Sequence, residues 1–371
     1  MSAQANEYST LLVLWPLQPT ILDSLRSSFE RVIYRPIQGP SPADAPRPTQ
    51  EEWEQTDAVF SFAIPEELTS VEQVPRLKFW QGASAGYSHI EASPFFKSLK
   101  PEDDITFANA SGIQVSTIGE HCLATVLMLY HKLHTIAVRH YAEQMWLSQA
   151  ELGGNYIREL NTLTVGIVEY GHIGRETARL FHSCGSTIYA LTRSGKPTSI
   201  NGFLIPNTGD PDGSIPSRYF ASISRESRDE FFGACDVVIN TLPESDRTRD
   251  TMADEEFRAM KGDAVYVNIG RGTTTDTEVL VQALKAQKAE GEEAAATGTL
   301  RIGGASLDVT NPQPLPPNHA LFTLSNAIIT PHMSGASLQY FQRAIEVLKV
   351  NVERLRQGKG ALNGWWGRKE E

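Results

Sequence analysis

The chain has 371 residues, enough for more than one domain, because a typical domain has roughly 100–200 residues. Its composition, 40% apolar, 21% charged and 9% aromatic, is that of a globular protein and argues against a disordered or coiled-coil protein. With 44 acidic and 33 basic residues the net charge is −11, which disfavours nucleic acid or an anionic membrane as a partner.

Three cysteines, Cys122, Cys184 and Cys235, lie far apart without a CxxC spacing, which argues against a disulfide framework and a cysteine-built zinc site. The histidines and acidic residues form no cluster with the spacing of metal ligands, so we expect no metal. The N-terminus lacks the basic start of a signal peptide, and no stretch approaches the ~20 apolar residues of a membrane span. We therefore expect a cytoplasmic enzyme.

Short apolar runs rich in β-branched residues alternate with longer helical patterns, which is typical of βαβ units and parallel sheets in α/β proteins. The predicted strands are Thr10–Trp15, Ala58–Phe62, Leu77–Trp80, Thr164–Val168, Thr187–Ala190, Asp236–Leu242, Ala264–Ile269, Gly304–Val309 and Ala327–Thr330. Residues 193–228 are rich in Ser, Gly, Pro and Arg and predict an irregular insertion. The apolar spacing over Ser116–Arg139 predicts one long helix, either a dimer arm or an ordinary buried helix.

The segment Thr164–Ala178 predicts a strand that runs into a helix through a glycine-containing turn, the pattern of a dinucleotide-binding βαβ unit. Gly171 and Gly174 occupy the second and third glycine positions of that fingerprint, which allow close approach of the pyrophosphate and close helix–strand packing. Glu169 occupies the first position, where a carboxylate would lie near the pyrophosphate. The hypothesis of a dinucleotide site therefore competes with that of an unoccupied turn.

The second strand of this unit ends in Thr192, Arg193 and Ser194, followed by Lys196, with no acidic residue among them. An acidic residue there would bind the 2′-hydroxyl of NAD, whereas an arginine suits the 2′-phosphate of NADP. The pattern favours NADP(H), with NAD(H) as the alternative.

Five segments, in this order and at these spacings, together resemble the D-isomer-specific 2-hydroxyacid dehydrogenase family. They are Ser84–His89, Gly171–Gly174, Val267–Asp276, Gly304–Pro316 and Ile328–Gly335. The resemblance implies an α/β fold of two Rossmann-like domains, with an NAD(P)-binding domain of residues 116–332 inserted into a substrate-binding domain of residues 1–115 and 333–371. It also implies a homodimer formed through the cofactor domains, which makes the helix over 116–139 a plausible dimer arm.

By the same resemblance, Arg271 binds the substrate carboxylate and carbonyl, a task that suits a planar guanidinium, and His332 is the acid/base. The N–H groups around Ala85 and Gly86 resemble a loop that grips the substrate carboxylate, and Asn109 resembles a position flanking the cleft. The cofactor-binding positions are Gly171, His172, Ile173, Thr192, Arg193, Ser194, Thr241, Leu242, Pro243, Ile269, Gly270, Asp308, His332 and Ser334.

Two positions depart from the family pattern. Gln313 stands where a glutamate usually pairs with the histidine; it can orient the imidazole but cannot stabilise its charge. Glu169 is the second departure. Together they leave three hypotheses open: a 2-keto acid reductase, a cofactor-sensing or catalytically impaired relative, and formate-type hydride transfer, which needs no acid or base.

The substrate pocket is poorly specified by the sequence. Trp80, Tyr87, Trp146 and Tyr340 could line it, which would suit a bulky or aromatic 2-keto acid, or they could be core and interface aromatics.

Overall fold

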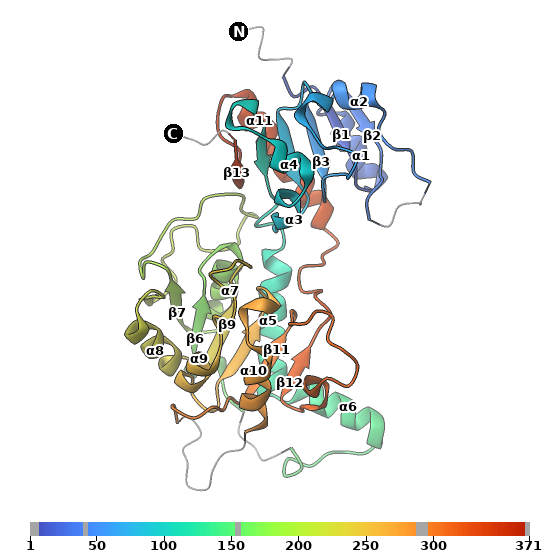
Figure 1. Cartoon of the computed structure of the whole chain (residues 1–371). Helices are drawn as coiled ribbons and strands as arrows, with labels where there is room; N and C mark the ends of the chain where they lie inside the picture. The colour runs from blue at the N-terminus through green and yellow to red at the C-terminus, as the bar shows by residue number, and fades with distance from the viewer. Residues whose placement is uncertain (1–6, 40–43, 153–156, 287–295, 368–371) are drawn as a thin grey trace. The chain divides into compact units, whose positions relative to one another are not determined.

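The computed structural model describes residues 7–39, 44–152, 157–286 and 296–367, and the chain divides into two compact units (Figure 1). The first unit comprises Met1–Ile113, Asn201–Ile205 and Ser337–Glu371, and the second comprises Gln114–Ile200 and Pro206–Ala336. Each unit has its own sheet, and parallel pairs dominate both sheets. The α/β fold class predicted from the sequence is thereby confirmed.

The sheet of the first unit has six described strands in the order β13-β5-β4-β3-β1-β2, and only β13 runs antiparallel to its neighbour. The strands are β1 (Thr10–Val13), β2 (Arg31–Tyr34), β3 (Ala58–Ser61), β4 (Phe79–Gly82), β5 (Thr106–Ala108) and β13 (Gly364–Trp366). The helices are α1 (Pro19–Arg26), α2 (Gln50–Glu54), α3 (Ser88–Glu91), α4 (Pro94–Ser98) and α11 (Tyr340–Arg356), with 3₁₀ turns at Val71–Gln73 and Pro101–Asp103.

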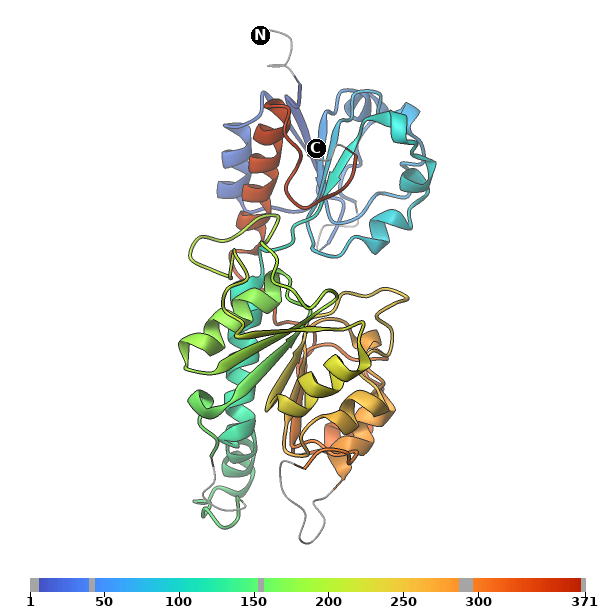
Figure 2. The ribbon, with the colours of Figure 1, turned by 90° about the vertical axis from the view of Figure 1, so that its left-hand side faces the viewer.

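Both faces of this sheet are covered, which explains why its central strands β1, β3 and β4 are buried at every position. In Figure 2, α1 (blue) and α11 (red) lie together on one face. Leu11 and Val13 of β1 join the core on that side, with Leu348 of α11. Leu12 of β1 points to the opposite core, where Trp80 is completely buried.

The sheet of the second unit has seven described strands, all parallel, in the order β12-β11-β10-β9-β6-β7-β8. The strands are β6 (Thr164–Val168), β7 (Thr187–Thr192), β8 (Arg218–Ala221), β9 (Val237–Asn240), β10 (Val265–Asn268), β11 (Gly304–Leu307) and β12 (Ala327–Ile329). The helices are α5 (Val115–Tyr130), α6 (Leu133–Glu143), α7 (His172–Ser183), α8 (Arg225–Ala234), α9 (Asp254–Ala259) and α10 (Thr277–Lys285). Further 3₁₀ turns lie at Leu160–Thr162, Gly272–Thr274 and Ala320–Thr323.

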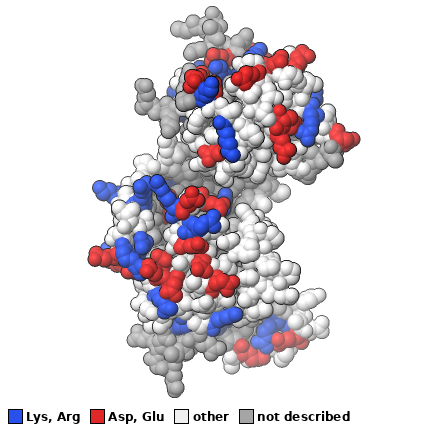
Figure 3. Space-filling view, viewed as in Figure 1, with Lys and Arg blue, Asp and Glu red and all other residues white. Residues whose placement is uncertain are grey.

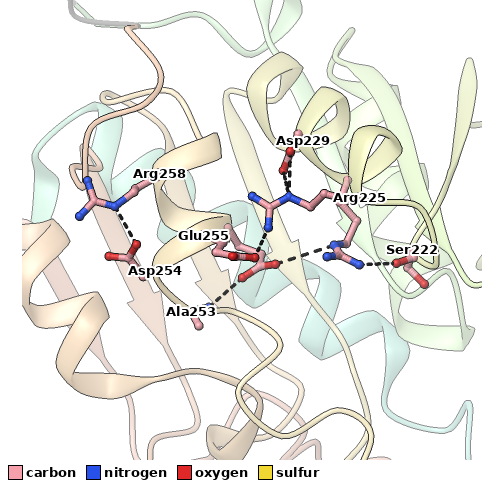
Figure 4. A network of polar contacts seen from close by, with 9 residues as sticks. Ser222, Arg225, Asp229, Ala253, Asp254, Glu255 and Arg258 are labelled. Atoms are coloured by element: carbon pink, nitrogen blue, oxygen red, sulfur yellow. Dashed lines mark hydrogen bonds and ion pairs between the residues drawn. The ribbon is translucent and has the colours of Figure 1, made fainter.

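Helices α5 and α7 cover one face of this sheet, and α8, α9 and α10 cover the other (Figure 2). The exposed side of α8 and α9 carries alternating charges. Arg225 pairs with Asp229 at 2.8 Å and with Glu255, while Arg258 pairs with Asp254 at 2.7 Å (Figure 4). Acidic and basic side chains are likewise interspersed over the face shown in Figure 3.

The prediction of a single helix over Ser116–Arg139 is wrong, because the chain forms two helices, α5 and α6. Lys132 separates them with a left-handed backbone, φ 55°. The ring of His134 lies at the bend, with Nδ1 3.1 Å from the carbonyl oxygen of Met128 and Nε2 2.8 Å from that of Ser325. α5 packs on the sheet, whereas α6 buries no side chain within the described chain.

The predicted insertion at 193–228 contains a regular strand, β8, and the start of α8. The segment between β7 and β8 is held by two buried side chains. Asp210 accepts hydrogen bonds from Tyr170, at 2.8 Å, and from the N–H of Ile215, at 3.0 Å. Arg175 of α7 donates to the carbonyl oxygens of Asp210 and Thr198, each at 2.6 Å.

Two searches of the described residues give negative results. None of the described helices is long and apolar enough to cross a membrane. No group of three or more histidine, cysteine or acidic side chains there could hold a metal ion.

Gly166 of β6 offers a direct test of the packing between the sheet and α8. A Cβ at this position would lie 2.4 Å from Sγ of Cys235 and 2.6 Å from the ring of Phe231. Gly166→Ala is therefore expected to lower the free energy of unfolding by about 1–3 kcal/mol, measured by denaturant unfolding. The matched control is Gly233→Ala in α8, where the nearest atom is 3.5 Å away. That change should be neutral or stabilising, and equal losses for the two variants would contradict the packing.

Candidate functional site at the carboxyl edge of the seven-stranded sheet

The strand order of the second unit reverses between β9 and β6. In open α/β sheets, ligands bind at the carboxyl ends of the strands where such a reversal opens a crevice. Because all described strands of this sheet are parallel, the loops that follow them meet at this one edge. The loops after β6, β7, β9, β10, β11 and β12 carry the predicted cofactor-binding positions, together with Arg271 and His332.

In the turn between β6 and α7, the first turn of the helix packs directly against the end of the strand. A Cβ on Gly174 would lie 2.6 Å from the carbonyl oxygen of Glu169 and 2.8 Å from Cγ2 of Ile167, so only glycine allows this packing of helix against strand. The Thr241 hydroxyl, after β9, donates to the same carbonyl of Glu169 at 2.7 Å. The turn is thus tied to the neighbouring strand, and Gly171 caps α7, whose first residues are His172 and Ile173.

Glu169 occupies a position in this turn whose backbone conformation favours glycine. Its φ is +70°, in the left-handed region where a side chain costs roughly 1–2 kcal/mol. Burial raises the pKa of its carboxyl group, and Arg175 only partly offsets this effect. The carboxylate lies 4.0 Å from where a Cβ on Gly171 would sit, beside the N-terminus of α7, which is where a helix attracts phosphate.

The end of β7 presents basic side chains to solvent. Arg193, Ser194 and Lys196 are exposed, and neither cation has an ion-pair partner among the described residues. Thr192 shapes this turn, because its hydroxyl accepts a hydrogen bond from the N–H of Gly195 at 3.1 Å. The available positive charge at this strand end suits an anionic group of a ligand.

Two buried asparagines fix the neighbouring strand ends, a feature that the sequence analysis missed. Asn240 accepts from the N–H of Leu242 at 3.0 Å, and Asn268 accepts from the N–H of Gly270 at 3.1 Å. Both amides also donate inward, Asn240 to the Tyr266 hydroxyl at 3.0 Å. The sequence does carry a signal for this feature, because each of the two apolar strands ends in an asparagine. The loops they shape hold the predicted positions Thr241, Leu242, Pro243, Ile269 and Gly270.

Gly270 permits the two loops to touch, because a Cβ there would lie 2.5 Å from the carbonyl oxygen of Leu242. The next residue, Arg271, is half-buried, and its guanidinium donates to the carbonyl oxygen of Gly270 at 2.8 Å. No carboxylate among the described residues pairs with Arg271, so its charge is available to an anionic ligand.

Asp308, after β11, is 2% exposed, and its carboxylate binds the loop that follows β12. It accepts from the Thr330 hydroxyl at 2.6 Å and from the N–H groups of Met333 and Ser334 at 2.9 and 3.0 Å. Burial opposes ionisation, but these hydrogen bonds outweigh it and hold the pKa of Asp308 below its usual value. Asp308 therefore positions the loop that carries His332.

His332 and Gln313 lie together as the sequence predicts. Nε2 of Gln313 lies 2.8 Å from Nδ1 of the imidazole, and both residues are exposed. An amide can donate to or accept from Nδ1, so Gln313 can orient the ring in either protonation state. The other ring nitrogen, Nε2, has no partner among the described residues and is available to a substrate.

Ala85 and Gly86 belong to the first unit and follow β4. The Ser84 hydroxyl donates to the carbonyl oxygen of Gly86 at 2.7 Å. The carbonyl oxygen of Ser84 accepts from the N–H of Ala110 at 2.9 Å. No described residue accepts a hydrogen bond from the N–H of Ala85 or Gly86, so both can bind an anion.

Two other predicted positions of the first unit, Asn109 and Trp80, make contacts within that unit. Asn109 accepts from the N–H of Ser111 at 2.9 Å and so forms a local turn. The indole of Trp80 donates to the Ser61 hydroxyl at 2.9 Å inside the core, so the core alternative is correct for Trp80. In the second unit, Trp146 is 89% exposed.

Comparison with known proteins agrees with this architecture. Residues 123–334 match the family model described as "D-isomer specific 2-hydroxyacid dehydrogenase, NAD binding domain". A glyoxylate reductase of Thermofilum pendens is 26% identical over 292 residues, 78% of this chain and 75% of that protein. A hydroxypyruvate reductase of Blautia hydrogenotrophica is 24% identical, covering 81% and 83% of the two chains.

Solved structures share the fold. The TT0316 protein from Thermus thermophilus is 25% identical with a TM-score of 0.67, covering 96% of this chain and 99% of that one. A D-isomer specific 2-hydroxyacid dehydrogenase from Xanthobacter autotrophicus Py2, solved with NADPH and MES, is 19% identical with a TM-score of 0.71, covering 96% and 98%.

The family model covers more than half of the chain, and the motifs that suggested the family lie in the loops described above. This chain therefore belongs to the D-isomer specific 2-hydroxyacid dehydrogenase family, and it is an oxidoreductase that interconverts 2-keto acids and 2-hydroxy acids with a nicotinamide dinucleotide.

Proposed function

We propose that the second unit, essentially residues 116–332, binds the dinucleotide, and that residues 1–115 and 333–371 bind the substrate. The observation that carries this assignment is the carboxyl edge of the seven-stranded sheet. There the glycine turn, the Gln313–His332 pair and three cations follow strands of one parallel sheet. These cations, two after β7 and Arg271 after β10, have no ion-pair partner among the described residues. The residues present fit a dinucleotide, since the turn at Gly174 has no room for a Cβ and α7 begins beside it.

In this proposal the reduced nicotinamide, when bound, would supply the hydride that the C2 carbon of the keto acid accepts. Arg271 pairs with the substrate carboxylate and polarises the carbonyl, a role that suits an unpaired guanidinium. The N–H groups of Ala85 and Gly86 bind the carboxylate. His332 donates a proton from Nε2 to the carbonyl oxygen, which completes the hydroxy acid, and Gln313 and Asp308 position the ring.

We also propose that the enzyme prefers NADP(H) to NAD(H). Support comes from Arg193 and Lys196, which are exposed and have no carboxylate partner in the described part of the chain, at the end of β7, where a ribose 2′-phosphate would lie. The absence of an acidic side chain at this strand end leaves the 2′-hydroxyl of NAD without its usual acceptor.

A homodimer through the second unit is the third proposal. Helix α6 buries none of its side chains in the described chain, and it exposes Leu133 (49%), Val138 (68%) and Tyr141 (89%). Met145 and Trp146, which follow it, are also exposed. Apolar side chains gathered in this way are typical of an interface between subunits.

We propose, finally, that the enzyme works in the reducing environment of the cytoplasm. Cys184 is a free thiol exposed at the surface, which a reducing compartment would preserve.

Gln313→Glu tests the role of the pair. A carboxylate beside Nδ1 would stabilise the imidazolium, so keto acid reduction at pH 7–8 is expected to rise several-fold and its alkaline limb to move to higher pH. The measurement is the pH profile of kcat/KM for glyoxylate with saturating NADPH. Gln149→Glu adds the same charge at an exposed site of the second unit and should leave the profile unchanged. A profile that Gln313→Glu does not move would contradict the pairing role.

Arg193→Ala tests the phosphate site. Loss of a charge-assisted contact should weaken NADPH binding about 10-fold or more and NADH binding by much less, because only NADPH carries the 2′-phosphate. Dissociation constants from fluorescence titration measure both. Arg26→Ala, at an exposed site of the first unit, is the control. Equal losses for the two cofactors would exclude this assignment.

Val138→Glu tests the interface. A charge on the exposed apolar side of α6 should convert the dimer to a monomer in sedimentation velocity experiments. Ile223→Glu, at a site that is 75% exposed in the same unit, should leave the dimer intact. A wild-type protein that sediments as a monomer, or a Val138→Glu protein that sediments as a dimer, would overturn the proposal.

A further inference from the structure

A row of aromatic rings lies at the carboxyl ends of two strands in the first unit. Trp15 follows β1 and Phe62 follows β3, and their ring centroids are 5.2 Å apart. Trp15 stacks on Phe341 of α11 at 5.4 Å, and Phe62 stacks on the imidazole of His89 in α3 at 5.7 Å. The row therefore joins four segments that are distant in the sequence.

Both ends of this row attach to the loop that carries Ala85 and Gly86. At one end, the ring centroids of Tyr340 and Phe341 are 5.0 Å apart, and the Tyr340 hydroxyl donates to the carbonyl oxygen of Ala83 at 3.0 Å. At the other end, Nε2 of His89 lies 2.6 Å from the carbonyl oxygen of Phe62. The aromatic row thus flanks the loop on either side, between Ala83 and His89.

These rings pack against the edge of the core and are not enclosed by it. Phe62 is 36% exposed, and Trp15, Tyr340 and Phe341 are each half-buried, in contrast to Trp80 in the same unit, which is completely buried. A contiguous set of partly exposed rings presents an apolar surface to a ligand.

The position of Trp15 is fixed by its packing. A Cβ on Gly39, whose φ is +68°, would lie 2.4 Å from the indole, so the backbone of the loop after β2 packs closely against the ring. A surface that is already ordered before binding loses little conformational entropy when a ligand contacts it.

We propose that this row forms the subsite for the substrate side chain and that the enzyme prefers 2-keto acids with an aromatic substituent at C3. This inference rests on the proposed function, in which the N–H groups of Ala85 and Gly86 bind the substrate carboxylate. A carboxylate held there places the C3 substituent within the rings that flank the same loop. Aryl groups gain from such rings both buried apolar area and aromatic pairing, whereas glyoxylate has no side chain to bury.

The experiment compares kcat/KM for phenylpyruvate and for glyoxylate with saturating NADPH. The full-length wild-type enzyme should prefer phenylpyruvate by about 10-fold or more, and Phe62→Ala should lower that ratio by about 10–100-fold, the range over which apolar pocket contacts discriminate substrates. Phe62→Tyr keeps the ring and should retain the preference. Phe322→Ala removes a ring that is 56% exposed in the second unit and should leave the ratio unchanged.

The outcomes separate this inference from the proposed function. Reduction of glyoxylate without a preference for phenylpyruvate, or a ratio that Phe62→Ala does not change, would overturn the aromatic subsite alone. Failure to reduce either acid would overturn the proposed function and the inference with it. Equal thermal unfolding midpoints of the Phe62 variants and the wild type would show that the changed ratio reflects the subsite.

Discussion

The chemistry proposed for this protein depends on one constraint, the parallel direction of all seven described strands in the second unit. Parallel strands place their carboxyl ends at one edge, so loops that are distant in the sequence lie on a common rim. The reversal between β9 and β6 opens that rim where the glycine turn lies. Close backbone approaches at Gly174 and Gly270 then hold the loops that line it against one another.

Buried polar side chains hold that rim in place. Asn240 and Asn268 fix the ends of β9 and β10, and Asp308 ties the loop after β12 to the end of β11. These three side chains use their hydrogen-bonding groups within the protein. Arg271 and His332 keep N–H groups or ring nitrogens that can bind a substrate. The separation of positioning residues from reacting residues is what a preorganised site requires.

The sequence predicted the central strands well, because apolar β-branched residues dominate β6 and β9. It missed β2, β5, β8 and β13. Three of them, β2, β8 and β13, are edge strands with partly exposed side chains, and β5 is buried but only three residues long, so all four carry little pattern. It also missed the bend at Lys132, where no glycine or proline marks the end of α5. The contact at this bend joins His134 to Ser325, 191 residues away, and no local pattern reveals it. The predicted cofactor positions follow strands of the second unit, so the parallel sheet brings their loops to one edge, while the roles of the individual residues stay predictions.

The most direct test of the central claim is whether the rim binds a dinucleotide although Glu169 occupies the first position of the turn. Fluorescence titration of the wild type and of Glu169→Gly with NADPH and NADH measures this. We predict saturable binding of NADPH to the wild type, tighter than that of NADH, and tighter still in Glu169→Gly, which removes both the carboxylate and the strain of φ +70°. No saturable binding of either cofactor to the wild type would contradict the account.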